Sequence, residues 1–164
     1  MSRRRQGREL ALGCLYAHYS TGQPIDEVFT GQAKRMTCDR DTQGYARRLL
    51  QAAVDHGEEI DREIRDGAVN WDFGRIGQME KNILRLSIAE LRFLPETPAK
   101  VIINEALEMT REYAGEESRG FVNAILDRVY KRDMETPNTE PGERTAVGNK
   151  TDEPPPPISD AGTN

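Results

Sequence analysis

The first eight residues hold four arginines, Arg3, Arg4, Arg5 and Arg8, and no acidic residue. A guanidinium group binds phosphate in a planar, two-pronged geometry and also stacks on exposed bases. One interpretation of this composition is an RNA site in which about four phosphates are neutralised. The logarithm of the binding constant would then fall with the logarithm of salt concentration with a slope of about −3. By composition alone, a basic leader that contacts no ligand is an equally good interpretation.

The sequence offers no pattern for catalysis or for a bound metal. Its two histidines, His18 and His56, lie outside the usual metal-ligand spacings. His18 follows Cys14 by one helical turn, but two further ligands are missing. No glycine-rich phosphate loop occurs. We therefore expect a protein that is not an enzyme and has no cofactor or metal. Cys14 and Cys38 favour buried thiols in a reducing compartment over a disulfide.

The apolar residues before position 133 recur at helical spacing throughout, and no strand pattern competes with them. We expect an all-α fold, a compact bundle of six or seven helices in two packed halves. The halves are expected at about 1–66 and 77–132, with 67–76 as the link. The spacing predicts helices over about 4–19, 25–35, 39–65, 78–94, 98–113 and 116–132.

Local signals refine these boundaries. Gly22 should end the first helix, and Thr97 is the expected N-cap of a helix whose first position is Pro98. The wide apolar face of 78–94 predicts burial on more than one side. In the link, Trp71 and Phe73 are expected to pack across the junction between the halves.

The last segment, 133–164, differs in composition from the rest. It holds seven acidic and two basic residues, which account for the whole net charge of −5, and it is rich in proline. Such a segment buries too little apolar surface to offset the entropy of ordering, so we expect a disordered acidic tail. No apolar run reaches the ~20 residues that span a bilayer, and no secretory leader follows the basic start, so a cytoplasmic protein is expected.

Three short strings combine apolar residues at helical spacing with a polar residue near the apolar face. They are the segments 80–85, 102–106 and 121–127, which include Asn82, Arg85, Asn104 and Asn123. Polar groups in such places usually make defined hydrogen bonds. Together with the arginine-rich start, these strings resemble the family of the transcription antitermination factor NusB, over about residues 3–132.

The resemblance implies a small helical protein that binds the single-stranded boxA element of nascent ribosomal and phage transcripts. Carried over residue by residue, it implies RNA binding by Arg3, Arg4, Arg5 and Arg8. It also places the loop before the last helix at the RNA and partner surface, which implicates Ser118 and Arg119. The acids of that loop would repel phosphate, and helix capping is an equal interpretation for Glu116.

The resemblance also implies a protein partner, the ribosomal protein NusE, and a place in the RNA polymerase antitermination complex. The matching partner-binding positions are Tyr16, Glu80, Tyr113 and Glu117. Aromatic anchors among acids suit a basic ribosomal protein. For Tyr16 and Tyr113, core packing is the alternative that sequence alone favours.

Other functions stay open at this point. One is a helical protein–protein adaptor or homodimer that binds no RNA, since NusB-like proteins occur as monomers and as dimers. Another is a stand-alone relative of the RNA-binding domain of ribosomal RNA cytosine methyltransferases. The chain lacks the nucleotide-binding α/β domain that follows in those enzymes.

Overall fold

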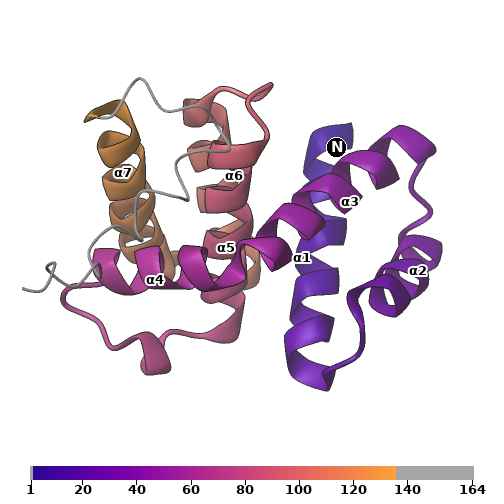
Figure 1. Ribbon diagram of the computed structural model, residues 1–164, viewed down its shortest axis with the longest axis horizontal. Coiled ribbons are helices and arrows are strands. Elements are labelled where there is room, and N and C mark those ends of the chain that lie inside the picture. The colour runs from indigo at the N-terminus through magenta and orange to yellow at the C-terminus, as the bar shows by residue number, and fades with distance from the viewer. Residues whose placement is uncertain (1, 136–164) are drawn as a thin grey trace, which may run out of the picture.

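The computed structural model describes residues 2–135, which form an all-α fold (Figure 1). In chain order its elements are α1 (Arg3–Thr21), α2 (Ile25–Met36), α3 (Arg40–Asp55), α4 (Gly57–Gly67), the 3₁₀ turn η1 (Phe73–Arg75), α5 (Gln78–Phe93), α6 (Ala99–Tyr113), the 3₁₀ turn η2 (Glu116–Ser118) and α7 (Arg119–Glu135). The predicted all-α bundle is therefore confirmed. The expected disordered tail falls on 136–164, outside the described residues, whereas 133–135 belong to α7.

Capping residues set both ends of α1 and the start of α3. The Ser2 hydroxyl accepts a hydrogen bond from the Arg5 backbone N–H (3.1 Å), which caps α1. Gly22 ends α1 in the left-handed conformation (φ 73°), as its position in the sequence predicts. The Asp39 carboxylate caps α3 by accepting from the backbone N–H of Thr42 (2.8 Å).

The predicted single helix over 39–65 is wrong, because the chain breaks into α3 and α4 at His56. His56 leaves helical geometry (φ −107°, ψ 21°), and Gly57, a poor helix former, follows it. The His56 ring stacks on Phe93, with centroids 4.0 Å apart. The break lets α3 pack on α1 while α4 packs on α5 and α7. By its contacts α4 thus lies with the later helices, although the expected link is at 67–76 (Figure 1).

Two other predicted helix starts are also wrong. Thr97 does not cap α6, since Pro98 occupies the N-cap position and the helix begins at Ala99. The segment from Glu116 forms the 3₁₀ turn η2 before α7 begins at Arg119. Proline supplies no N–H and fixes its own φ, so it sits as readily just before the first turn as within it.

The centre of the molecule is α5, which contacts α1, α3, α4, α6 and α7. Every residue from 82 to 90 is buried, which confirms the predicted burial on more than one side. Among its polar members, Arg85 binds Asp61 of α4 through two bonds (2.7 and 3.1 Å) and donates to the Asn82 Oδ1 (2.9 Å), whereas the Asn82 Nδ2 has no hydrogen-bond partner among the described residues. By contrast, Asn104 and Asn123, which the sequence places near an apolar face, are exposed.

The predicted packing in the link holds in part. Phe73 is partly buried against the core, with Arg65 and Lys81 over its ring. Trp71 remains 46% exposed and meets Phe121 edge-on at 5.1 Å. Both cysteines are free and buried, as predicted.

Candidate nucleic-acid and partner interface

Two of the four leader arginines are accessible at the start of α1. The Arg3 side chain is 73% exposed and lies 3.3 Å from Asp39 and 3.8 Å from Asp41. Arg4 is exposed, and its guanidinium carbon lies 4.2 Å from the centroid of the Tyr45 ring. Exposed ion pairs of this kind are weak, so both cations are available to a phosphate.

Arg8, which the resemblance implies for RNA binding, is buried inside the protein and not exposed on its surface. Its Nε and Nη2 donate to the two carboxylate oxygens of Glu90 in α5, at 2.8 and 2.6 Å. The Tyr45 hydroxyl of α3 donates to the same carboxylate. Arg8 is 5% and Glu90 1% exposed. Burial lowers the pKa of the guanidinium, but the bonds and charge of Glu90 outweigh it and the pKa is raised. Arg8 therefore joins three helices beneath the surface.

Arg5 is held by a cluster of carboxylates between α1 and α6. Its guanidinium lies 3.1 Å from Glu9, 3.2 Å from Glu105 and 2.6 Å from Glu112, and its side chain is only 15% exposed. Burial, with the charge of Glu9 and a hydrogen bond to it, raises the pKa of Tyr113 to about 12. The surroundings of Arg5 are therefore already negative, and a phosphate must displace a carboxylate to reach it.

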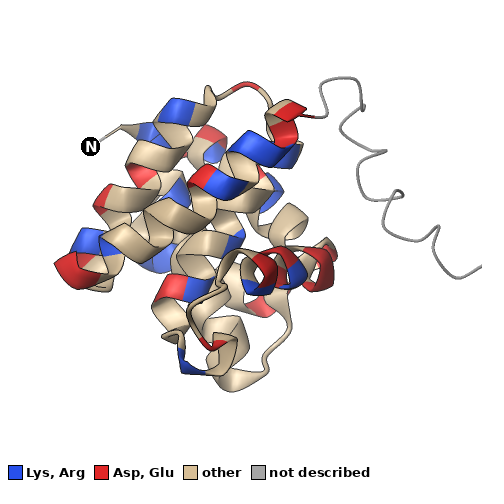
Figure 2. Ribbon diagram, turned by 90° about the vertical axis from the view of Figure 1, so that its left-hand side faces the viewer, with Lys and Arg blue, Asp and Glu red and all other residues tan. Residues whose placement is uncertain are grey.

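The structure adds two arginines that sequence reasoning missed, Arg40 and Arg48 of α3. They share a groove of about 630 Å³ with the start of α1. The groove is lined by Arg3, Arg4, Arg40, Asp41, Thr42, Gly44, Tyr45 and Arg48. Basic and acidic segments alternate along the helices near the N-terminus (Figure 2). The sequence feature that could have indicated these two residues is their spacing of eight, which puts Arg40 and Arg48 on the same side of a helix.

Residues predicted for RNA and for the partner meet at a second hollow. The Ser118 hydroxyl donates to the Glu80 Oε1 at 2.9 Å, and Glu117 lies beside them. This hollow of about 400 Å³ is lined by Asn70, Trp71, Asp72, Arg75, Ile76, Gly77, Glu80, Glu117, Ser118 and Phe121. It is both acidic and aromatic, the combination expected for a basic protein partner.

The remaining predicted residues lie on the surface. Tyr16 is 44% and Tyr113 43% exposed, so the core-packing alternative is wrong for both. Arg119 pairs with Glu116 at 3.1 Å at the start of α7. Large aromatic rings exposed to this degree are candidate anchors for a protein partner.

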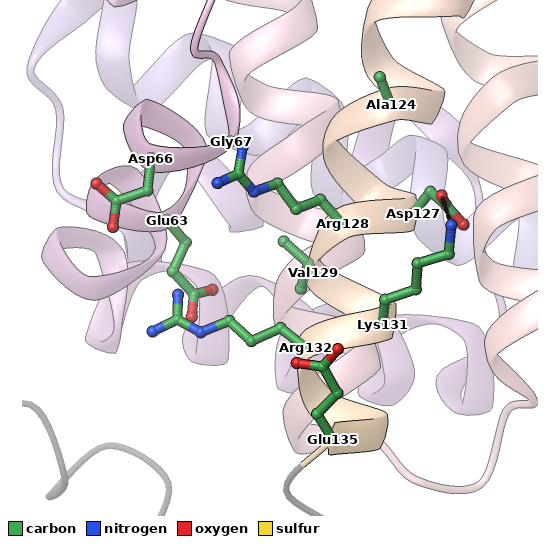
Figure 3. A pocket seen from close by; sticks show the side chains of 10 residues that line it. All are labelled: Glu63, Asp66, Gly67, Ala124, Asp127, Arg128, Val129, Lys131, Arg132 and Glu135. Carbon is green, nitrogen blue, oxygen red and sulfur yellow. Dashed lines mark ion pairs between the residues drawn. The ribbon is translucent and has the colours of Figure 1, made fainter.

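A third groove, of about 750 Å³, lies elsewhere, between α4 and α7 (Figure 3). Its walls carry both signs of charge, including an ion pair between Lys131 and Asp127 at 2.9 Å. None of the predicted site residues lines it. Within residues 2–135, no group of three or more His, Cys, Asp or Glu side chains is placed to hold a metal ion. Over the same residues, none of the helices has the length and apolar character to cross a membrane.

Comparisons with known proteins match most of the described chain. Residues 5–131 match the NusB family. A transcription antitermination protein NusB from Myxococcus xanthus is 38% identical over 133 residues, which cover 79% of this chain and 95% of that protein. One from Leptospira biflexa is 40% identical over 136 residues, covering 82% and 96%.

Solved structures give the same result. The chain is similar to that of a crystal structure of antitermination factors NusB and NusE in complex with dsRNA, with a TM-score of 0.74 and 32% identity. The match covers 80% of this chain and 98% of that one. A structure of T. maritima NusB gives a TM-score of 0.73 at 30% identity, covering 80% and 92%.

Proposed function

Because the chain belongs to the NusB family, we propose that it binds boxA-like single-stranded RNA in nascent ribosomal RNA transcripts together with the ribosomal protein NusE. It acts by binding rather than by catalysis. The joint complex presents RNA and NusE to RNA polymerase and so promotes processive transcription. A solved structure of similar fold holds NusB with NusE and dsRNA, which supports a joint role of NusE and RNA as partners of this fold.

In this proposal Arg3 and Arg4 contact RNA directly, while Arg8 positions Arg4 through Glu90 and Tyr45. The single observation that carries this division is burial: Arg3 is 73% exposed at its side chain, whereas Arg8 is buried on Glu90. Arg4 lies on the ring of Tyr45, which is itself fixed by the carboxylate that holds Arg8. Arg5 reaches RNA only by releasing one of its carboxylates.

The partner surface in this proposal consists of Tyr16, Glu80, Tyr113 and Glu117. The two tyrosines are exposed anchors, and the two glutamates line one hollow and supply negative charge. A basic ribosomal protein complements that charge. Ser118 and Arg119 lie next to this surface, so they are proposed to contact RNA that crosses from NusE.

The test is a titration of a fluorescent boxA-like RNA, with and without NusE. We expect NusE to increase the affinity. Changing Arg3 and Arg4 to Ala should make the salt slope shallower by about 1.4, from two phosphates at about 0.7 each on single strands. Glu117→Lys should weaken NusE binding with no loss of thermal stability.

The outcome that overturns the proposal is an RNA affinity that neither NusE nor the arginine changes affect. The protein would then be a protein–protein adaptor or homodimer that binds no RNA. An exposed arginine pair on another face, Arg62 and Arg128, is the matched control, and its change to Ala should leave RNA affinity unaltered.

A further inference from the structure

We infer that the exposed face of α3 is a second segment of the RNA site, on which Arg40 and Arg48 bind backbone phosphates of single-stranded RNA. This inference rests on the proposed RNA-binding function and extends it beyond the leader arginines. The two arginines line the same groove as Arg3 and Arg4, so RNA bound at the start of α1 is carried directly onto α3.

The spacing on α3 makes a continuous track. Positions 40, 44 and 48 recur every four residues and therefore share one side of the helix. Eight residues span about 12 Å along a helix, so the two cations serve different phosphates. Gly44 lies between them, and a Cβ there would meet no atom within 4 Å. At Gly44, the surface of α3 between Arg40 and Arg48 therefore has no side chain that would block an RNA backbone.

Both cations are available to a ligand. Among residues 2–135, Arg40 is exposed and has no ion-pair partner. Arg48 is 58% exposed, and its pair with Glu96 (2.8 Å) is a surface contact that a phosphate can replace at small cost. The adjacent Arg47 differs, since it pairs with Asp26 and lies over the Phe29 ring.

The track continues past Arg48. That residue also lines a neighbouring groove of about 470 Å³ that contains the stacked rings of His56 and Phe93. Stacking on aromatic and imidazole rings is how unpaired bases are commonly held. RNA that leaves Arg4 along α3 therefore meets two cations and then an aromatic pair.

One feature of the groove opposes RNA, and it supplies an internal test. The Asp41 side chain is 89% exposed and lies in the groove wall. Its charge repels a phosphate on the way from Arg3 to Arg40. Asp41→Asn should therefore bind RNA more tightly than the natural protein does, and it leaves the helix cap at Asp39 in place.

The experiment compares two RNAs on the full chain: a boxA-like oligonucleotide and the same oligonucleotide with a short unstructured extension at each end. We expect the change of Arg40 and Arg48 to Ala to weaken binding of the extended RNA about tenfold at low salt. Its salt slope should become shallower by about 1.4. The short RNA, which reaches less of α3, should lose less affinity than the extended RNA. The control is again the change of Arg62 and Arg128 to Ala.

The outcomes separate this inference from the proposed function. If the α3 variant matches the control on both RNAs while loss of Arg3 and Arg4 weakens binding, α3 is not part of the site and the proposed function stands. If the natural protein binds neither RNA, both the proposed function and this inference are wrong. Because Asp41 also pairs with Arg3, a gain in affinity for Asp41→Asn supports the track only if it is larger on the extended RNA than on the short RNA. An equal gain on both RNAs, or unchanged affinity, counts against it. A thermal melt confirms that each variant folds.

Discussion

Replacing Arg8 by Ala tests whether this residue is a support of the fold rather than an RNA ligand. The change removes two short bonds to Glu90, whose side chain is almost wholly buried. Among residues 2–135, the carboxylate then keeps a hydrogen bond from the Tyr45 hydroxyl alone. Breaking a buried pair by removing one partner costs about 3–5 kcal/mol. A domain of this size has about 5–15 kcal/mol of stability, so the variant should be close to unfolding.

Urea denaturation followed by circular dichroism measures this effect. Arg3→Ala is the matched control, and because the Arg3 side chain is 73% exposed it should lose no more than about 1 kcal/mol. A triple change of Arg8 to Met, Glu90 to Leu and Tyr45 to Phe should restore much of the stability lost in Arg8→Ala, since it leaves no buried polar group unpaired.

The result that would refute this reasoning is a small loss of stability in Arg8→Ala, equal to that of Arg3→Ala, together with a large loss of RNA affinity. Arg8 would then leave Glu90 at little cost to bind phosphate. A large loss of stability with RNA affinity retained by the folded fraction would support the positioning role.

Three further predictions concern stability and reactivity. Hydrogen bonds from the first turn of α3 lower the pKa of the Asp39 carboxyl, so Asp39→Ala should melt earlier than the natural protein at neutral pH. The difference in melting temperature should shrink as the pH falls below about 3.9, the pKa of Asp in the unfolded chain, and vanish below the lowered pKa of Asp39 in the folded protein. A difference in melting temperature that does not depend on pH would contradict this prediction. A Cβ on Gly7 would lie 2.5 Å from the Tyr45 ring, whereas one on Gly13 meets only an ordinary contact, so Gly7→Ala should be less stable than Gly13→Ala by at least about 1 kcal/mol in urea denaturation. Burial raises the pKa of the Cys14 thiol to about 12, and mass spectrometry should find Cys14 unalkylated in the native protein and alkylated after unfolding.

Helices were predictable because their signals are local. The end of α1 at Gly22 and the many-sided burial of α5 follow from residue types and spacing. The apolar period runs through the break at His56, so Gly57 is the one local signal for it, and a single glycine is often tolerated within a helix. What decides the break is the packing of α4 on α5 and α7, which local sequence does not record.

The site was predictable only in outline, for the same physical reason. The leader arginines look equivalent in sequence, yet Glu90, the partner of Arg8, is 82 residues away. Two of the three partners of Arg5, Glu105 and Glu112, are 100 and 107 residues away. Long-range pairing thus separates surface cations from buried ones. Arg40 and Arg48 could not be predicted as site residues because the groove that joins them to α1 exists only in the folded chain.

Trp71 gives this protein a built-in optical reporter. It is the only indole in the chain, it is half exposed, and it sits with Glu80 and Glu117 at the edge of Phe121. Emission from a lone indole changes when neighbouring atoms displace water from it. NusE docking should therefore shift the fluorescence of the unlabelled protein, while RNA held only at Arg3 and Arg4 should leave it constant. One emission scan can thus distinguish NusE docking from RNA that is held only at Arg3 and Arg4.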